Sequence, residues 1–196
     1  MPKRQKQSRP LSAQNKGSVR MIGGLWRGRK IPVLDAPGLR PTTDRVRETV
    51  FNWLQGELLG ATCLDLFAGT GALGFESLSR GASHCDFVDN NPLVCRHLST
   101  QITALKADRM AASHCSTAQA YLSNLSACPD IIWIDPPYQL DLWSELMTQL
   151  QQKPPPKWIY IETARTQDEQ QLPSEWTLHR EMTVGQVWAR LFRVGG

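Results

Sequence analysis

The sequence lacks the features that mark several classes of protein. Its five cysteines form an odd set without a single CxxC spacing, so we expect neither a disulfide framework nor a zinc knuckle, and we predict no metal site. No apolar run approaches the length of a membrane span, and the densest one lies near Ile131. The first residues are polar and basic with no apolar segment behind them, which predicts no signal peptide and a cytoplasmic protein.

Most of the positive charge lies in residues 1–47. They contain 12 of the 22 Lys and Arg residues and only two acids, Asp35 and Asp44, so this segment has a net charge of +10. Residues 48–196 hold the other 10 basic residues and 16 acids, a net charge of −6. A basic end on an acidic body is typical of a protein that binds an anionic polymer. For residues 1–17, a disordered tail that aids solubility is an equally good interpretation.

Three segments of different composition follow each other along the chain. Residues 1–17 nearly lack large apolar side chains and should form a disordered basic tail. Residues 18–43 contain two short apolar and basic runs around Gly23-Gly24, which predict a basic β-hairpin extension. In residues 44–196, a helix that begins near Asp44 leads into alternating strands and helices, and then into an antiparallel hairpin around Gly185.

The alternation of strands and helices predicts an α/β fold with a mostly parallel, doubly wound sheet. Expected strands lie near residues 61–67, 85–89, 112–115, 131–134, 158–161, 176–182 and 186–193, and expected helices near residues 72–79, 92–106, 118–125 and 140–151. In such sheets, ligands bind at the carboxyl ends of the strands. The residues that directly follow each strand are therefore the candidates for chemistry.

A glycine-rich loop follows the first strand of the predicted sheet. Its spacing matches a dinucleotide fingerprint, and Asp89 lies 20 residues after Gly69, where a ribose-binding acid belongs. The glycines let a ligand approach the backbone beside a helix N-terminus, but they do not distinguish NAD from S-adenosylmethionine. Asp65 favours S-adenosylmethionine, because its carboxylate suits the ammonium of a methionine moiety better than a phosphate. The residues expected to hold the cofactor at this loop are Asp65, Phe67, Ala68, Gly69, Thr70, Gly71 and Gly74.

The most specific chemical signal is Asp135-Pro136-Pro137-Tyr138, which follows the apolar run 131–134. We expect this run to lie beside the first strand, on the side away from the second. Two prolines restrict the backbone and remove two N–H donors, so the segment presents the Asp135 carboxylate and the Pro136 carbonyl as acceptors. Tyr138 adds an aromatic face. We predict that Asp135, Pro136, Pro137 and Tyr138 form the catalytic segment.

A flat ring that carries two N–H donors fits these acceptors, and the exocyclic amino group of a nucleobase has this form. The base would leave its stack to enter the site, and Tyr138 would stack on it. Hydrogen bonds from the amine to the two acceptors would orient its nitrogen for in-line attack on a sulfonium methyl. Most of the rate would come from this positioning and from stabilising the positive charge that develops on nitrogen.

Taken together, these motifs closely resemble the bacterial RsmD family, the guanine-N2 methyltransferases of 16S ribosomal RNA. The resemblance covers residues 19–193 and includes Met21–Gly24, Leu39–Thr42, Leu64–Gly74 and Asp135–Tyr138. It implies a Rossmann-like class I methyltransferase fold: a mostly parallel seven-stranded sheet with a C-terminal antiparallel hairpin, and an N-terminal basic β-hairpin. It also implies S-adenosylmethionine as cofactor. The implied partner is 16S rRNA within the small ribosomal subunit or its assembly intermediate. We expect the protein to act as a monomer.

Further residues are assigned to the cofactor and to RNA. Asn90, Thr117 and Ala118 are the candidates for adenine contacts, although the family often has an aliphatic residue at the first position and an Asn or Asp near the other two. Trp26 is a candidate for an exposed stacking group. Basic residues with few acidic neighbours in sequence favour phosphate contact. The residues expected to bind RNA are Arg20, Arg27, Arg29, Lys30, Arg40, Thr42 and Arg45.

Four alternative functions remain open at this level. A DNA or RNA adenine-N6 or cytosine-N4 methyltransferase would use the same acceptor segment, and so would a methyltransferase that modifies glutamine in proteins. An NAD-dependent oxidoreductase would use the glycine fingerprint, but it would leave Asp135–Tyr138 unexplained. A noncatalytic RNA-binding module would explain the basic hairpin but not the acceptor-rich segment.

Overall fold

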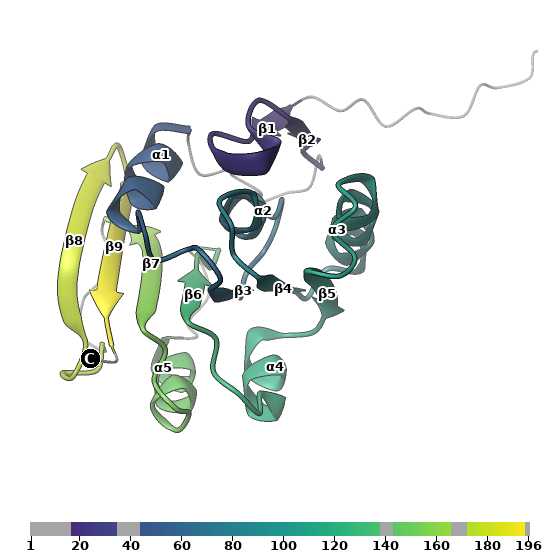
Figure 1. Cartoon of the computed structure of the whole chain (residues 1–196). Coiled ribbons are helices and arrows are strands. Elements are labelled where there is room, and N and C mark those ends of the chain that lie inside the picture. The colour runs from purple at the N-terminus through teal and green to yellow at the C-terminus, as the bar shows by residue number, and fades with distance from the viewer. Residues whose placement is uncertain (1–16, 35–43, 138–142, 166–171, 195–196) are drawn as a thin grey trace, which may run out of the picture.

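The computed structural model describes residues 17–34, 44–137, 143–165 and 172–194. Its elements alternate along the chain as the sequence pattern predicts (Figure 1). They are β1 (Ser18–Arg20), η1 (Gly24–Trp26), β2 (Lys30–Pro32), α1 (Asp44–Trp53), β3 (Thr62–Asp65), α2 (Ala72–Ser79), β4 (His84–Asp89), α3 (Pro92–Ala104), β5 (Ala111–Cys115), α4 (Ala118–Asn124), β6 (Ile131–Ile134), α5 (Trp143–Gln151), β7 (Trp158–Ala164), β8 (Thr177–Val184) and β9 (Val187–Arg193). The predicted tail lies outside the described residues, except for Gly17.

Seven strands form one sheet in the order β5-β4-β3-β6-β7-β9-β8. The first five strands of this order run parallel, whereas β9 pairs antiparallel with both β7 and β8. The chain leaves β3 toward β4 on one side and later returns through β6 on the other. This switch point confirms the expected placement of residues 131–134 beside the first strand of the sheet, and ligands bind at such a point in open α/β sheets.

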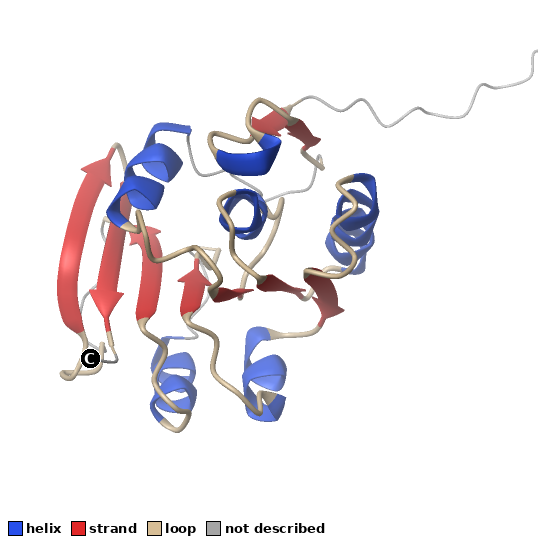
Figure 2. Ribbon diagram, in the orientation of Figure 1, coloured by secondary structure: helices blue, strands red, loops and turns tan. Residues whose placement is uncertain are grey.

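Helices cover both faces of the sheet (Figure 2). One face packs against α1, α2 and α3, where Phe51 contacts Trp133 and Phe75 contacts Phe87. The other face packs against α4 and α5 around Ile132, Ile134 and Ile161. Side chains alternate between the faces along each strand. A residue's position in its strand therefore tells which layer its side chain enters.

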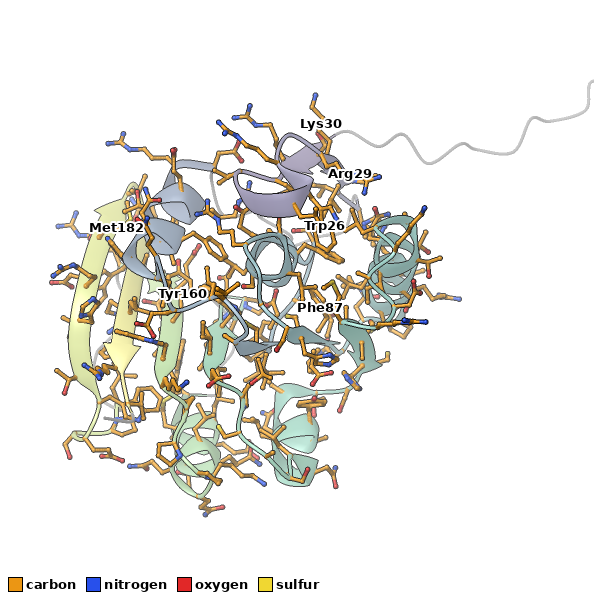
Figure 3. All side chains as sticks on the ribbon, in the orientation of Figure 1. Trp26, Arg29, Lys30, Phe87, Tyr160 and Met182 are labelled. Atoms are coloured by element: carbon orange, nitrogen blue, oxygen red, sulfur yellow. The ribbon has the colours of Figure 1, made fainter. Side chains whose placement is uncertain are left out.

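A separate two-stranded sheet, formed by β1 and β2, lies outside α2 (Figure 1). Val19 pairs with Ile31 and both are buried, so the hairpin shares the core of the main sheet. The expected stacking role of Trp26 is wrong for the free protein, because the residue is only 6% exposed. Figure 3 shows Trp26 between the hairpin and the helices, while Arg29 and Lys30 lie on the outer side.

Some boundaries differ from the expected ones for a physical reason. The strand expected to end near Ile161 continues to Ala164, because Glu162 and Thr163 keep pairing with β9 although their side chains are polar. The described part of the helix expected from residue 140 begins at Trp143, and residues 138–142 lie outside the described part of the chain. Among the described helices, none is both long and apolar enough to cross a membrane.

Candidate active site

Four carboxylates stand at the carboxyl ends of four neighbouring parallel strands. Asp89 ends β4, Asp65 ends β3, Asp135 follows β6, and Glu162 lies near the end of β7. Each lies two residues beyond a core residue of the face that α1, α2 and α3 cover. Strand alternation therefore directs Asp65, Asp89 and Glu162 to that face, and Asp135 directly follows β6. The sheet thus gathers the acids that the sequence predicted separately, and it adds Glu162, which was not predicted.

The strand registers place these acids at two levels. Asp65 is opposite Phe87 and Trp133, so Asp89 and Asp135 lie two residues further along their own strands. Two residues of a strand span roughly 6.6 Å. Asp65 therefore lies beneath the rim of the sheet, and its side chain is only 2% exposed. The other predicted acids are more accessible, since Asp89 and Asp135 are both partly exposed.

The glycine loop is held by backbone and side-chain hydrogen bonds. Gly69 N–H donates to Asp89 Oδ2 at 3.0 Å, and Gly74 N–H donates to Asp65 Oδ2 at 3.0 Å. Gly71 is the N-cap residue of α2 and has a φ of 74°, a conformation that L side chains rarely adopt. A Cβ on Gly74 would lie 2.3 Å from the Phe87 ring, so this glycine is needed for packing α2 on the sheet. The loop brings backbone, helix start and two carboxylates together.

Asp89 is fixed in place before any ligand binds. Its Oδ1 accepts the Asn91 N–H at 2.8 Å while its Oδ2 accepts the Gly69 N–H. A carboxylate offers about four acceptor positions, so two remain for hydroxyl donors. A ribose presents two adjacent hydroxyls, and this geometry suits the predicted role of Asp89.

Next to Asp89, the predicted adenine residues lie at the ends of β4 and β5. Ser116 N–H donates to the Asp89 carbonyl at 3.0 Å, which joins the two strand ends. Asn90 and Thr117 are exposed there, and Thr117 caps α4 by accepting the Ala120 N–H. Ala118 is buried with the core beneath α4, so its side chain serves packing.

Burial raises the pKa of the Asp65 carboxyl from its ordinary 3.8 to about 7. The nearby charge of Asp89 adds to this rise, and the Gly74 N–H opposes it. A carboxyl with a pKa near neutrality is poised to become charged when a cation arrives beside it. This behaviour fits the prediction that Asp65 faces the ammonium group of the cofactor.

The raised pKa of Asp65 predicts that S-adenosylmethionine binding depends on pH. The ammonium favours the carboxylate, so affinity should fall as the pH drops below about 7, by up to roughly tenfold per pH unit. The folding stability of the free protein should change in the opposite direction and rise as the pH falls. A carboxyl whose pKa is raised by folding binds its proton more tightly in the folded state, so low pH stabilises the fold. Isothermal titration calorimetry between pH 8 and 5.5 measures the affinity. An equally steep dependence in Asp65→Asn would contradict the assignment.

The proline segment meets the glycine loop across the switch point. Leu66 N–H donates to the Trp133 carbonyl at 3.0 Å, so the residues after β3 and β6 lie side by side. Asp135 is partly exposed, Pro136 is buried and Pro137 is exposed. Tyr138 lies outside the described residues, and its stacking role remains a prediction.

Glu76 of α2 was missed by the sequence analysis and anchors the basic hairpin. Its carboxylate accepts the backbone N–H groups of Ile22 and Gly23, each at 2.8 Å. It also pairs with Arg80 Nε at 2.7 Å and lies 3.9 Å from Arg47. Glu76 is fully buried within an almost wholly buried helix, so no local pattern marks it as polar surface or as an anchor.

The predicted RNA-binding residues form an exposed outer surface on the hairpin and α1. Arg20 also lies 3.8 Å from Asp44 of α1. The hairpin turn docks on the C-terminal end of α2, where Trp26 N–H donates to Ser79 Oγ at 2.9 Å, opposite the end that holds the glycine loop. The described and exposed members of the predicted set are Arg20, Arg27, Arg29, Lys30 and Arg45. Arg40 and Thr42 lie outside the described residues.

Comparisons with known proteins agree over nearly the whole chain. A family model described as Conserved hypothetical protein 95 matches residues 19–193. Ribosomal RNA small subunit methyltransferase D of Escherichia coli (strain K12) is 42% identical over 183 residues, which cover 90% of each chain. The protein of the same name from Haemophilus influenzae is 40% identical over 193 residues, covering 91% of this chain and 95% of its own.

Solved structures share this fold. That of yhhF, a proposed methyltransferase from Escherichia coli, has a TM-score of 0.80 at 41% identity and covers 91% of this chain and 98% of its own. A more distant structure, SMU.776, is a proposed methyltransferase complexed with SAH. It has a TM-score of 0.68 at 17% identity and covers 84% of this chain and 53% of its own. The predicted methyltransferase fold, with its C-terminal antiparallel hairpin, is confirmed.

Proposed function

Since this chain belongs to the Conserved hypothetical protein 95 family, the RsmD family that its motifs resemble, we propose that it methylates a guanine of 16S rRNA at the exocyclic N2. The methyl donor is S-adenosylmethionine and the substrate is the small ribosomal subunit or its assembly intermediate. One observation carries the proposal: Asp135-Pro136-Pro137 stands beside the glycine loop in a chain 42% identical to a ribosomal RNA small subunit methyltransferase D. The protein acts as a cytoplasmic monomer.

The described residues fit S-adenosylmethionine. The Asp89 carboxylate, held by two backbone N–H groups, accepts the ribose hydroxyls. Asp65, whose pKa burial raises to about 7, meets the ammonium group. Gly69 and Gly71 let the methionine part approach the loop backbone. Bound there, the cofactor supplies an electrophilic methyl group on a positively charged sulfur.

The chain's own residues orient the nucleophile. Asp135 and the Pro136 carbonyl accept the two N–H groups of the guanine amine, which directs the nitrogen lone pair toward the methyl group. The Asp135 charge stabilises the positive charge that develops on nitrogen during transfer. Asp135 need not remove a proton beforehand, because the amine proton becomes acidic only after the methyl group has moved.

The domain roles follow from the same arrangement. Residues 44–196 form the methyltransferase domain, and residues 18–43 form an extension that contacts RNA phosphates through Arg20, Arg27, Arg29 and Lys30. Anchoring by Glu76 makes this extension rigid on α2. An NAD-dependent oxidoreductase is disfavoured, because the similar proteins are named methyltransferases and the acceptor segment would have no role.

Labelling tests the proposed function directly. The protein is incubated with methyl-labelled S-adenosylmethionine and with small subunits that lack the modification, and the labelled nucleoside is identified by nuclease digestion and mass spectrometry. We expect N2-methylguanosine in 16S rRNA. Label in adenosine, in cytidine, in DNA or in protein would support the methyltransferase activity but contradict guanine as the substrate. Subunits that already carry the modification serve as the control and should take up no label.

A further inference from the structure

Glu162 lies on the target side of the site, one strand beyond Asp135. Ile134 of β6 is opposite Ile161 of β7, so the next residues, Asp135 and Glu162, stand at the same level of neighbouring parallel strands. Asp65 and Asp89 lie on the other side of Asp135, where the cofactor is proposed to bind. A base whose amine contacts Asp135 therefore extends toward β7.

The Glu162 carboxylate is buried and held in one orientation. Glu162 is only 4% exposed, and the Tyr160 O–H donates a hydrogen bond to its Oε2 at 2.8 Å. Tyr160 is itself fully buried against Trp133, with ring centroids 5.5 Å apart, on the face of the sheet that α1 covers (Figure 3). A carboxylate has about four acceptor positions, and the Tyr160 O–H uses one of them; Glu162 also has a further interaction within the protein.

The three amino bases differ at the ring nitrogens next to the exocyclic amine, because guanine has two such nitrogens, N1 and the lone-pair acceptor N3, whereas adenine and cytosine have one each. Of the two in guanine, N1 carries a hydrogen and is a donor. The one nitrogen in adenine, N1, and the one in cytosine, N3, each carry a lone pair and are acceptors. A fixed, buried carboxylate attracts a donor there and repels a lone pair, and an unmade hydrogen bond is most unfavourable where water is excluded.

We propose that Glu162 is the specificity-determining residue that selects guanine, by accepting the ring N1–H while Asp135 accepts the neighbouring amine. The inference rests on the proposed function and names the group that distinguishes guanine from adenine and cytosine at that site. Glu162 contacts the base and takes no part in the transfer. Its effect is on the choice of base, and it acts on kcat/KM for the nucleic acid.

Substitution in both partners tests the contact. The labelling experiment first locates the methylated guanosine, and small subunits are then reconstituted with 2-aminopurine ribonucleoside at that position. This base keeps the amine at C2 but has an acceptor at N1. We expect the protein to prefer guanosine by roughly 10²-fold in kcat/KM, the size of one hydrogen bond to a charged group. We expect Glu162→Gln to lose most of this preference, because its amide can donate to the N1 of 2-aminopurine.

The coupling between the two substitutions separates recognition from structure. The missing O6 of 2-aminopurine affects all variants alike, so only an interaction with position 162 changes the ratio between the bases. Asp135→Asn is the matched control, because it should slow both bases by a similar factor and leave the preference unchanged. If Glu162→Gln lowers kcat/KM equally for guanosine and 2-aminopurine, Glu162 has a structural role and the inference is wrong.

A second variant covers the case in which Glu162→Gln does not fold. Tyr160→Phe keeps the carboxylate but removes the hydrogen bond that orients it, and should reduce the guanosine preference by about threefold to tenfold. An unchanged preference in a folded Tyr160→Phe protein would contradict the proposal. The two proposals also fail separately. Label in adenosine or cytidine would contradict both the proposed function and the role of Glu162. N2-methylguanosine, with a guanosine preference that does not depend on position 162, would contradict only the role of Glu162.

Discussion

Asp135→Ala is expected to lower kcat by roughly 10²- to 10⁴-fold while the dissociation constant for S-adenosylmethionine stays within about threefold. The loss follows from the proposed role of Asp135, because removing its carboxylate removes both an acceptor that orients the amine and the negative charge that stabilises the transferring nitrogen. Single-turnover methyl transfer on small subunits measures the chemical step, and calorimetry with S-adenosylmethionine measures binding.

Two matched variants make this result specific. Asp135→Asn keeps one acceptor oxygen without the charge, so its kcat should lie between those of the parent protein and Asp135→Ala. Asp89→Ala should mainly affect cofactor binding, which we expect to weaken by roughly 10²-fold. Asp89 accepts the N–H groups of Gly69 and Asn91 and, as proposed, the ribose hydroxyls. If Asp135→Ala weakens cofactor binding as much as Asp89→Ala does, Asp135 belongs to the cofactor pocket and its assignment to the base fails.

Gly24→Ala is expected to detach the basic hairpin from α2. The added Cβ would lie 1.7 Å from the Ser79 carbonyl oxygen, a backbone atom, and Gly24 has a φ of 71°. Neither the clash nor the conformation can be relieved by a side-chain rotation. We expect a loss of at least about 3 kcal/mol in the free energy of unfolding, measured with urea. The KM for small subunits should rise by more than about tenfold, because the RNA-binding surface is no longer held.

Gly28→Ala is the control in the same turn. Its φ of 82° is similarly unfavourable for alanine, but no atom lies within 4 Å of the added Cβ. We expect it to destabilise by only about 1–2 kcal/mol, with an almost unchanged KM. Equal effects of the two substitutions would mean that backbone conformation, and not the contact with Ser79, explains both. If the Gly24→Ala protein is destabilised but its KM for small subunits is unchanged, the hairpin does not contribute to RNA binding.

The main elements of the site could be predicted from the sequence because their signals are local. Glycine spacing, the two prolines and the alternation of apolar runs reside in short segments, and the rule that ligands meet strand ends then identifies Asp65, Asp89 and Asp135 as candidates. The same local logic predicted the hairpin of residues 18–43. It failed for Trp26, because exposure depends on what a side chain meets after folding, and here that is α2.

The order of strands and helices, the glycine loop and the acceptor segment were determined by the sequence alone, since each depends on neighbours within a few residues. The placement of residues 131–134 beside the first strand was also expected from the sequence, but only the tertiary structure decided the register of neighbouring strands. Register places Asp65 beneath the rim and Glu162 level with Asp135, and the packing of the hairpin on α2 makes Glu76 the buried anchor of the hairpin. The β3–β6 register alone joins Asp65 to Trp133, 68 positions further along the chain, and contacts between such distant residues form only when the core assembles.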